Sequence, residues 1–177
     1  MDTRIIILKE LQNLIFSYPD FPKKGILFKD LLGILQDPEI FKDLINKMSE
    51  SFIIKNCGAI ASVDARGFIF GSPLAMVISK PMVVFRKPGK LPGELITAEY
   101  ELEYGKSSLS IQKDAIKNLD NFAIVDDLLA TGGTAKCASS LLKNSGKNVT
   151  GLSVVCEIEK LRGSQNLDCP VVSQLKY

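Results

Sequence analysis

The feature that most constrains this fold is the stretch of residues 122–134, which runs from an apolar segment through two acids into a small-residue turn. Its sequence is Phe122, Ala123, Ile124, Val125, Asp126, Asp127, Leu128, Leu129, Ala130, Thr131, Gly132, Gly133 and Thr134. Residues 122–125 are typical of a strand buried on both faces, and residues 134–143 predict a helix. A strand, a turn and a helix in this order form the unit of a parallel sheet, in which ligands bind where the strands end.

The turn within residues 126–134 suits a ligand that carries both a phosphate and hydroxyl groups. Backbone N–H groups at the start of a helix favour a phosphate through hydrogen bonds and through the helix dipole. Asp126 and Asp127 can accept hydrogen bonds from sugar hydroxyls. The stretch has neither the GxxxxGK[ST] pattern nor GxGxxG, so neither of those nucleotide-binding motifs is indicated. A surface turn with two solvated acids is the alternative interpretation.

The rest of the chain alternates helical and strand patterns, which predicts a doubly wound α/β fold with a mainly parallel sheet and flanking helices. Helices are expected over residues 4–16, 38–53 and 68–79, besides 134–143. Asp37 should begin the second helix, and Gly146 should follow the last. Pro19 and Pro22 should end the first helix, and residues 21–35 predict a loop with short extended pieces. Further core strands are expected over residues 57–63, 82–85, 152–156 and 171–175.

Residues 96–104 alternate regularly between apolar and polar side chains. One face carries Ile96, Ala98, Tyr100, Leu102 and Tyr104, and the other carries Thr97, Glu99, Glu101 and Glu103. This period predicts an antiparallel ribbon exposed on one side, with a turn at Gly105 and Lys106 and a return strand over residues 108–112. Glu99, Glu101 and Glu103 are candidate acid/base groups, and the pattern alone does not choose among them or exclude a simply solvated row of acids.

Composition excludes several classes of function. The formal charge is +2, from 22 basic and 20 acidic residues, which is no electrostatic footprint of a nucleic-acid binder. The chain has no histidine, so Ser-His and Cys-His catalytic pairs are excluded. Its four cysteines form no CxxC pair and indicate reduced thiols in the cytoplasm. The apolar run at residues 5–8 is too short for a signal segment or a membrane span.

Five segments together carry a resemblance to a known family. Residues 126–134 are similar to the phosphoribosyl-pyrophosphate (PRPP) motif of the type I phosphoribosyltransferases. Residues 21–30, 63–68, 86–93 and 102–106 match, in the same order, the members of that family that act on adenine. The resemblance covers about residue 18 to the C-terminus. It implies a single phosphoribosyltransferase domain over residues 1–177, with an N-terminal helix and base-binding hood at 1–35. The α/β core would cover 36–177, including a flexible loop at about 93–112.

The resemblance implies a role for each side of PRPP. Asp126 and Asp127 would accept hydrogen bonds from the ribose hydroxyls, and the remainder of the 126–134 stretch would hold the 5′-phosphate. Arg66 would face the pyrophosphate, for which a guanidinium fork is well suited, and Gly67 would let the backbone approach the ligand. Arg86, Lys87 and Lys90 would neutralise the pyrophosphate. A surface ion pair for Arg66, and ordinary surface charge for the other three, are the alternatives.

The resemblance also implies the catalytic group and the base pocket. It favours Glu103 as the acid/base residue, in a loop whose closure excludes water. Backbone groups of Leu27 and Lys29 would contact the edge of adenine, while Phe28 and Ile158 would cover its two faces. Simple core packing is the alternative for Phe28. Lys29 departs from the family pattern, which has arginine there, so a side-chain role at that position is in doubt.

These expectations combine into one function: transfer of the 5-phosphoribosyl group from PRPP to adenine, giving AMP and pyrophosphate for purine salvage. Mg²⁺ would assist while held mainly by PRPP and water, with no direct protein ligand. A homodimer is implied, and neither nucleic acid nor a membrane is an expected partner. Three alternatives stay open: a transferase for hypoxanthine, guanine or orotate; a PRPP-sensing regulator that binds nucleic acid; and a phosphate-binding module without catalysis.

Overall fold

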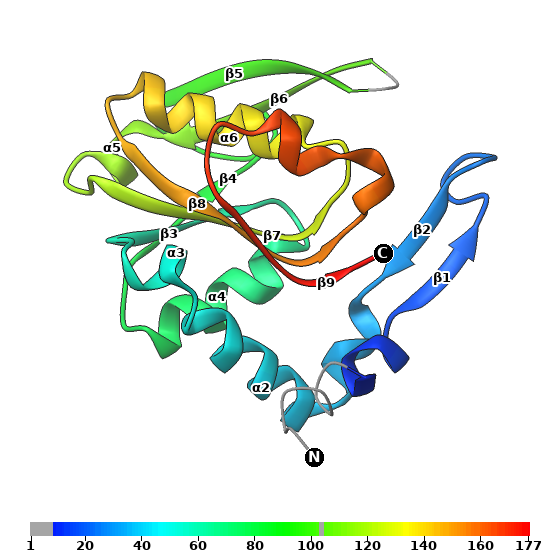
Figure 1. Cartoon of the computed structure of the whole chain (residues 1–177). Coiled ribbons are helices and arrows are strands. Elements are labelled where there is room, and N and C mark those ends of the chain that lie inside the picture. The colour runs from blue at the N-terminus through cyan, green and yellow to red at the C-terminus, as the bar shows by residue number, and fades with distance from the viewer. Residues whose placement is uncertain (1–8, 103–104) are drawn as a thin grey trace. The chain divides into compact units, whose positions relative to one another are not determined.

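The computed structural model describes residues 9–102 and 105–177 of this chain, without the side chains of residues 101, 102, 105 and 106. The chain divides into two compact units, Met1–Lys47 and Met48–Tyr177. The larger unit contains a parallel five-stranded sheet in the order β4, β3, β7, β8, β9 (Figure 1). Its strands are β3 (Ala59–Val63), β4 (Met82–Phe85), β7 (Asn121–Leu129), β8 (Asn148–Glu157) and β9 (Val171–Lys176). This sheet confirms the predicted parallel α/β architecture.

Helices cover both faces of this sheet, as a doubly wound fold requires. Helix α4 (Gly67–Val77) lies against β3, where a Cβ on Gly71 would be 2.4 Å from the Ser62 hydroxyl. Helix α6 (Gly133–Asn144) packs on the opposite face, and its Ala138 and Leu142 join one buried apolar cluster with Ile124 of β7. Figure 1 shows these two helices on opposite sides of the strands. The short helices α3 (Phe52–Lys55) and α5 (Lys113–Ile116) complete the larger unit, with two 3-10 turns, η2 (Glu159–Leu161) and η3 (Gly163–Asn166).

The predicted antiparallel ribbon is present as β5 (Leu95–Leu102) and β6 (Gly105–Gln112). Ile96, Ala98 and Tyr100 pack against the apolar cluster, as their alternation predicts. The turn, however, was predicted at the wrong place. Gly105 pairs with Leu102, and Lys106 pairs with Glu101, so both residues of the predicted turn belong to strand β6. Residues 103 and 104 lie outside the described residues.

The smaller unit differs from the prediction at its start. The first helix, whose described part begins at residue 9, ends at residue 13, well before the prolines that were expected to end it. Phe16–Pro19 (β1) instead pairs antiparallel with Leu27–Asp30 (β2). Residues with high strand propensity, such as Phe16 and Tyr18, gain a partner strand here, and that long-range pairing outweighs the local helical pattern. A 3-10 turn, η1 (Leu32–Gln36), follows β2.

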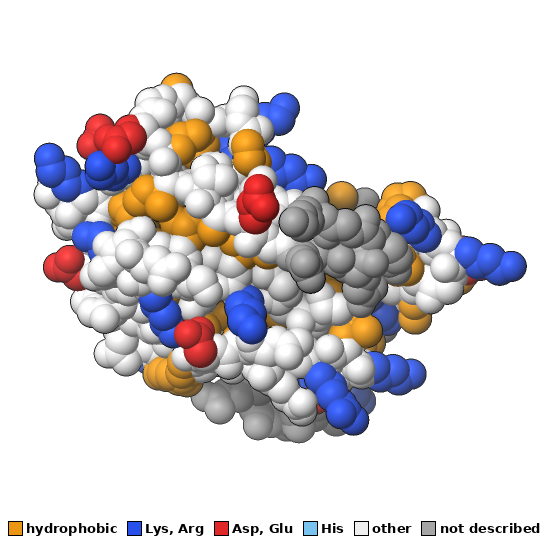
Figure 2. Space-filling model, turned by 90° about the horizontal axis from the view of Figure 1, so that it is seen from above, with side chains coloured by type: hydrophobic (Ala, Val, Ile, Leu, Met, Phe, Trp, Pro, Cys, Tyr) orange, Lys and Arg blue, Asp and Glu red, His pale blue; other side chains and the backbone are white. Residues whose placement is uncertain are grey.

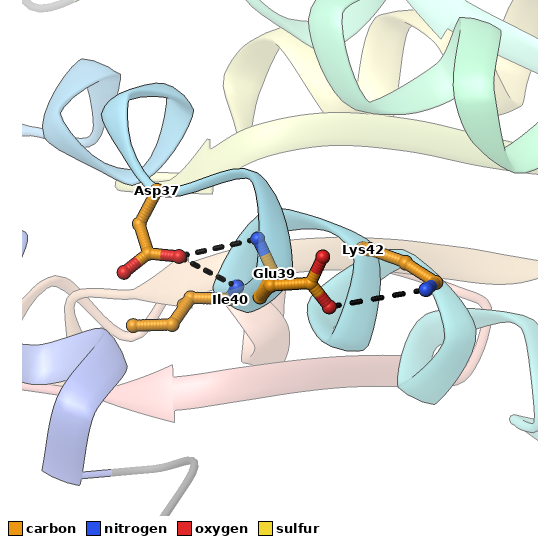
Figure 3. Close-up of polar contacts among 4 residues, drawn as sticks. All are labelled: Asp37, Glu39, Ile40 and Lys42. Carbon is orange, nitrogen blue, oxygen red and sulfur yellow. Dashed lines mark hydrogen bonds and ion pairs between the residues drawn. The ribbon is translucent and has the colours of Figure 1, made fainter.

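Helix α2 (Pro38–Ser49) begins where the sequence predicts. Asp37 Oδ1 accepts hydrogen bonds of 3.1 Å from the backbone N–H groups of both Glu39 and Ile40 (Figure 3). Figure 3 also shows the ion pair between Lys42 and Glu39, 3.8 Å long, one turn along the helix. The expected continuation to residue 53 is wrong, because Ser51 starts a separate helix, α3, by accepting a hydrogen bond from Ile54 N.

The charge distribution agrees with the small net charge. The face seen in Figure 2 carries both Lys and Arg and Asp and Glu side chains, with mainly basic ones at the right of the view. The four cysteines, all within the described residues, form no disulfide with one another. Within the described ranges, no helix is both long and apolar enough to span a bilayer.

Candidate active site

The centre of the candidate site is the loop of residues 130–133, here called the phosphate loop, which joins β7 to α6. β7 continues through Asp126 and Asp127 to Leu129, four residues beyond the predicted end of this strand. Because β7 pairs with the neighbouring strand β8 as far as Leu129, Asp126 and Asp127 are residues of the strand and not of the loop. Gly132 then turns the chain with a φ of +87°, a left-handed conformation that disfavours a side chain.

The phosphate loop lines a cavity of about 160 Å³ at the carboxyl end of the sheet. Every residue of the predicted 126–134 stretch except Asp127 lines it, together with Ala135, Leu152 and Val154. Parallel sheets place their ligand sites at this end of the strands. The structure therefore brings Asp126 and the hydroxyl-bearing loop to one hollow beside the start of a 12-residue helix.

The two adjacent acids share a hydrogen bond between their carboxyl groups but differ in burial. Asp126 is half-buried at the cavity, and its Oδ1 accepts a 2.8 Å hydrogen bond from the backbone N–H of Asp127. Burial raises the pKa of Asp126 well above its usual range, and the charge of Asp127 raises it further. Asp127 is only 4% exposed, and burial raises its pKa too, although the Arg66 guanidinium opposes that rise.

Asp127, predicted to bind the ribose of PRPP, and Arg66, predicted to bind its pyrophosphate, lie in contact with each other. Arg66 Nε is 2.8 Å from Asp127 Oδ2. Arg66 stands at the start of α4, on the loop after β3, and the Asp64–Ala65 peptide of that loop is cis. A Cβ on Gly67 would be 3.0 Å from both Asp126 Oδ1 and the Val125 carbonyl oxygen. The backbone of this loop therefore lies directly against the end of β7.

Arg86 is held on the neighbouring strand end by a second ion pair. Its Nε is 3.0 Å from Asp64 Oδ2, and its Nη1 donates to the Lys90 carbonyl at 3.2 Å. Its backbone exchanges two hydrogen bonds with Ser110 of the ribbon. Lys87 and Lys90 are exposed on the loop that follows. Arg66 and Arg86 thus follow adjacent parallel strands, β3 and β4, at the same edge of the sheet.

The ribbon also contacts the start of α6. Thr134 Oγ1 donates a 3.3 Å hydrogen bond to the Tyr100 hydroxyl, so β5 touches the predicted phosphate site two residues before its last residue, Leu102. Glu103, the predicted acid/base residue, lies outside the described residues. Glu99 is exposed, as expected for the polar face of β5.

The predicted base-binding residues fall in both units. Leu27, Phe28 and Lys29 form most of β2, where the Phe28 ring meets Phe21 edge to face at a centroid distance of 5.1 Å. Lys29 Nζ donates to Ser17 Oγ at 2.9 Å. In the larger unit, Ile158 N donates to the Leu129 carbonyl, which holds Ile158 beside the end of β7.

Three residues at this site were given no role from the sequence: Asp64, Gly163 and Asn166. Asp64 lies inside the matched segment 63–68. A carboxylate at the end of a strand, two residues before Arg66, could have been identified from the sequence as a partner for an arginine. Asn166 Nδ2 donates to the Thr131 carbonyl at 2.9 Å, across 35 residues of sequence. Gly163 is buried against the carbonyl of Ala130. No local pattern identifies contacts of this kind.

Comparison with known proteins decides the family. No protein-family model matches the chain. The adenine phosphoribosyltransferase of Prochlorococcus marinus strain MIT 9515 is 59% identical over 168 residues, covering 95% of this chain and 98% of that protein. The chain belongs to the adenine phosphoribosyltransferase family.

Solved structures of adenine phosphoribosyltransferases agree with this assignment. The enzyme from Thermoanaerobacter pseudethanolicus has a TM-score of 0.91 at 42% identity, over 96% of this chain and 99% of that one. The enzyme from Saccharomyces cerevisiae, solved with an imino-altritol bisphosphate and adenine, has a TM-score of 0.88 at 37% identity. That match covers 97% of this chain and 99% of the yeast one.

Proposed function

We propose that this chain transfers the 5-phosphoribosyl group of PRPP to adenine, giving AMP and pyrophosphate in purine salvage. The observation that carries the proposal is the cavity formed by the phosphate loop and Asp126 at the end of β7. A phosphate is favoured at the start of α6. The Asp126 carboxylate, which lines the same cavity, suits the ribose hydroxyls. Relatives that cover nearly the whole chain are named for this activity.

The reaction is a displacement at C1′ of PRPP. The bond from C1′ to the pyrophosphate oxygen breaks, and its electron pair leaves with pyrophosphate, while adenine N9 forms the new bond to C1′. Bond breaking runs ahead of bond formation, so the ribose carries oxocarbenium-like positive charge. The protein contributes mainly by positioning the reactants and by stabilising charge. Asp126, whose carboxylate faces the cavity, would hold the ribose hydroxyls.

The leaving pyrophosphate would be bound by Arg66, Arg86, Lys87 and Lys90. Two contacts hold the Arg86 guanidinium in place. Its Nε forms the ion pair with Asp64, and its Nη1 donates to the Lys90 carbonyl. Asp127 restrains Arg66 in the same way. Each carboxylate thereby orients a cation next to the strand end where the pyrophosphate would lie, which lowers the cost of ordering that side chain on binding.

Mg²⁺ fits this site as a cation carried by the substrate. Within the described ranges, no three His, Cys, Asp or Glu side chains gather to form a metal cage. Mg²⁺ usually keeps several waters and is bound largely by substrate phosphates, so the ion would be held mainly by PRPP and water, with no direct protein ligand. When bound, the ion would neutralise charge on the pyrophosphate as that group departs.

Glu103 is proposed to accept the proton that adenine loses as N9 bonds to C1′. Glu99 and Glu101 occupy the same face of the ribbon pattern and are the matched controls. Glu103→Gln should lower kcat by about 100-fold or more, the usual contribution of general acid–base catalysis. Glu99→Gln and Glu101→Gln should leave kcat unchanged. An equal loss in all three variants would contradict the assignment.

Backbone groups of Leu27 and Lys29 in β2 are proposed to contact the edge of adenine, and the Phe28 ring is proposed to cover one of its faces. An extended strand presents N–H and C=O groups in a row, which suits recognition of the edge of a planar base. Lys29→Ala should leave the KM for adenine within about twofold if only the backbone is used, since one exposed side-chain hydrogen bond contributes little. A large increase would assign the Lys29 side chain to the base.

We further propose that the chain acts in the cytoplasm as a homodimer. Four cysteines that form no disulfide with one another suit a reducing compartment. Large apolar side chains are exposed on α3 and α4, with Phe52 at 56%, Met76 at 75% and Val77 at 47% exposure. Exposed apolar side chains of this size are candidates for an interaction surface. Met76→Glu should lower the molar mass in sedimentation equilibrium to that of a monomer.

The test of the function is AMP formation from PRPP and adenine, with hypoxanthine, guanine and orotate in parallel and with Mg²⁺ present or removed by EDTA. We expect turnover with adenine alone, lost with EDTA. Turnover with another base would overturn the base-pocket assignment. No turnover, alongside PRPP binding, would favour the phosphate-binding or sensor alternatives, which a gel shift with nucleic acid at low salt separates.

A further inference from the structure

The outer side of the phosphate loop is covered by the turn of residues 162–166, which contains η3. Two glycines allow this close approach. A Cβ on Gly132 would lie 2.7 Å from the Gly163 carbonyl oxygen, and a Cβ on Gly163 would collide with the Ala130 carbonyl. The turn and the loop are therefore in backbone contact, with no space for a side chain between them.

The turn is also tied to the body of α6. Asp168, just after the turn, accepts a 3.1 Å hydrogen bond from Ser139 Oγ and forms a 2.7 Å ion pair with Lys143 Nζ. Both partners belong to α6, whose first turn begins at the phosphate loop. The same helix thus anchors the turn and starts the loop, so the position of the turn is defined relative to the loop that it touches.

One side chain of the turn reaches the loop. Asn166 Nδ2 donates a 2.9 Å hydrogen bond to the carbonyl oxygen of Thr131. The peptide bond between Thr131 and Gly132 is not among the cis bonds of the chain, and in a trans peptide the C=O and the following N–H point in opposite directions. Since the carbonyl faces Asn166, the N–H of Gly132 must point away from Asn166. Thr131 and Gly132 both line the cavity.

We propose that Asn166 is a positioning residue for phosphate binding. Its amide fixes the rotation of the Thr131–Gly132 peptide so that the Gly132 N–H is directed at the 5′-phosphate. Without this hydrogen bond the peptide can rotate, because Gly132 lacks a side chain that would restrict it. The inference rests on the proposed function for the identity of the phosphate, but it concerns any ligand whose phosphate binds in this loop.

Asn166→Ala and Gln165→Ala make the matched pair of variants, because both side chains are exposed on the same turn. Loss of one hydrogen bond that orients a binding group should raise the KM for PRPP by about 3- to 10-fold, with kcat within about twofold. The KM for adenine and the midpoint of thermal unfolding should stay unchanged. Gln165→Ala should match the wild type in every measurement.

A binding measurement separates this inference from the proposed function. Calorimetric titration with ribose 5-phosphate should show the same 3- to 10-fold weakening in Asn166→Ala, whether or not the wild type makes AMP. A wild type that binds ribose 5-phosphate but transfers nothing to adenine would defeat the proposed function and leave the inference standing. Equal affinity in Asn166→Ala and wild type, or no binding of ribose 5-phosphate by the wild type, would overturn the inference.

A second variant guards against a general loss of structure. Asn166→Asp keeps the size of the side chain but replaces the N–H donor with an oxygen that repels the Thr131 carbonyl. Gln165→Glu adds the same charge one residue away. Weaker ribose 5-phosphate binding in Asn166→Asp than in Gln165→Glu supports the positioning role. An equal loss in the two would assign the effect to charge alone and overturn it.

Discussion

The ion pair between Arg66 and Asp127 should support the folded state as well as the ligand site. Asp127 carries a nearly buried carboxylate, with 6% of the side chain exposed, whereas the Arg66 side chain is 31% exposed. Removing the partner of a fully buried charge costs about 3–5 kcal/mol. Since Arg66 is about a third exposed and water already weakens the pair, we expect Arg66→Gln to lose about 2 kcal/mol. In a domain of this size that corresponds to a fall of about 4–8 °C in Tm.

The loss should depend on pH, because it arises from a carboxylate without its cation. Burial holds the pKa of Asp127 above its usual value, and Arg66 opposes that rise. Without Arg66 the pKa of Asp127 rises further, so the folded variant binds a proton that the unfolded chain releases. Its stability therefore increases as pH falls toward the unfolded pKa of about 3.9. The Tm deficit of Arg66→Gln should be largest near pH 8 and should shrink by pH 5.

The assay is thermal unfolding of the ligand-free protein at both pH values, by circular dichroism. Arg66→Gln combined with Asp127→Asn should recover most of the lost Tm, because no buried charge is left. Lys113→Gln is the control: it breaks an exposed ion pair with Glu94, whose side chain is 69% exposed, and should not measurably change the Tm. A deficit that is the same at pH 5 and pH 8, or absent at pH 8, would refute the reasoning.

Three further predictions follow from single contacts. Asp126→Asn should raise the Tm of the ligand-free protein, increasingly from pH 5 to pH 8, because burial and Asp127 raise the pKa of Asp126 and its ionisation opposes folding as pH rises. The same variant should lose about 10- to 100-fold in kcat/KM for PRPP, the range for a hydrogen bond to a charged group; an unchanged kcat/KM would remove Asp126 from the ribose site. Gly132→Ala forces a side chain into a left-handed turn against Gly163 and should cost about 1–2 kcal/mol in urea unfolding together with a raised KM for PRPP. Asp37→Ala removes two hydrogen bonds at the start of α2 and should cost about 1 kcal/mol in urea unfolding; Glu50→Ala is the exposed control.

Local patterns were sufficient for much of the fold. β4 and the start of α2 lie where the sequence predicts them, because an apolar run or a capping residue acts over a few neighbouring positions. Gly146 likewise follows α6 with a φ of +73°. The break between α2 and α3 has a local cause, whereas the largest error involves a partner far away in sequence. The helix expected through residue 16 gives way to β1, because Phe16–Pro19 pairs with β2, and no local pattern contains that pairing.

The sequence was sufficient to select residues that line the cavity, but not to predict the side-chain contacts between distant segments. The stretch of residues 126–134 identified the cavity, since the strand, turn and helix are contiguous in sequence. The pairing of Arg66 with Asp127, of Arg86 with Asp64 and of Asn166 with the Thr131 carbonyl depends on strand order. Strand order is a property of the whole sheet, and each of these contacts joins segments that only the assembled sheet brings together.

Burial and ion pairing distinguish the two adjacent acids, Asp126 and Asp127. Asp126 and Asp127 are consecutive residues of β7, and their carboxyl groups share a hydrogen bond. A ligand in the cavity can reach Asp126, whereas Asp127 is only 4% exposed and its Oδ2 is 2.8 Å from Arg66 Nε. The two carboxylates therefore differ in how readily a ligand reaches them. Asp126 is suited to hold the sugar directly, and Asp127 acts through the guanidinium that it orients, so Asp127→Asn should raise the KM for pyrophosphate in the reverse reaction more than Asp126→Asn does.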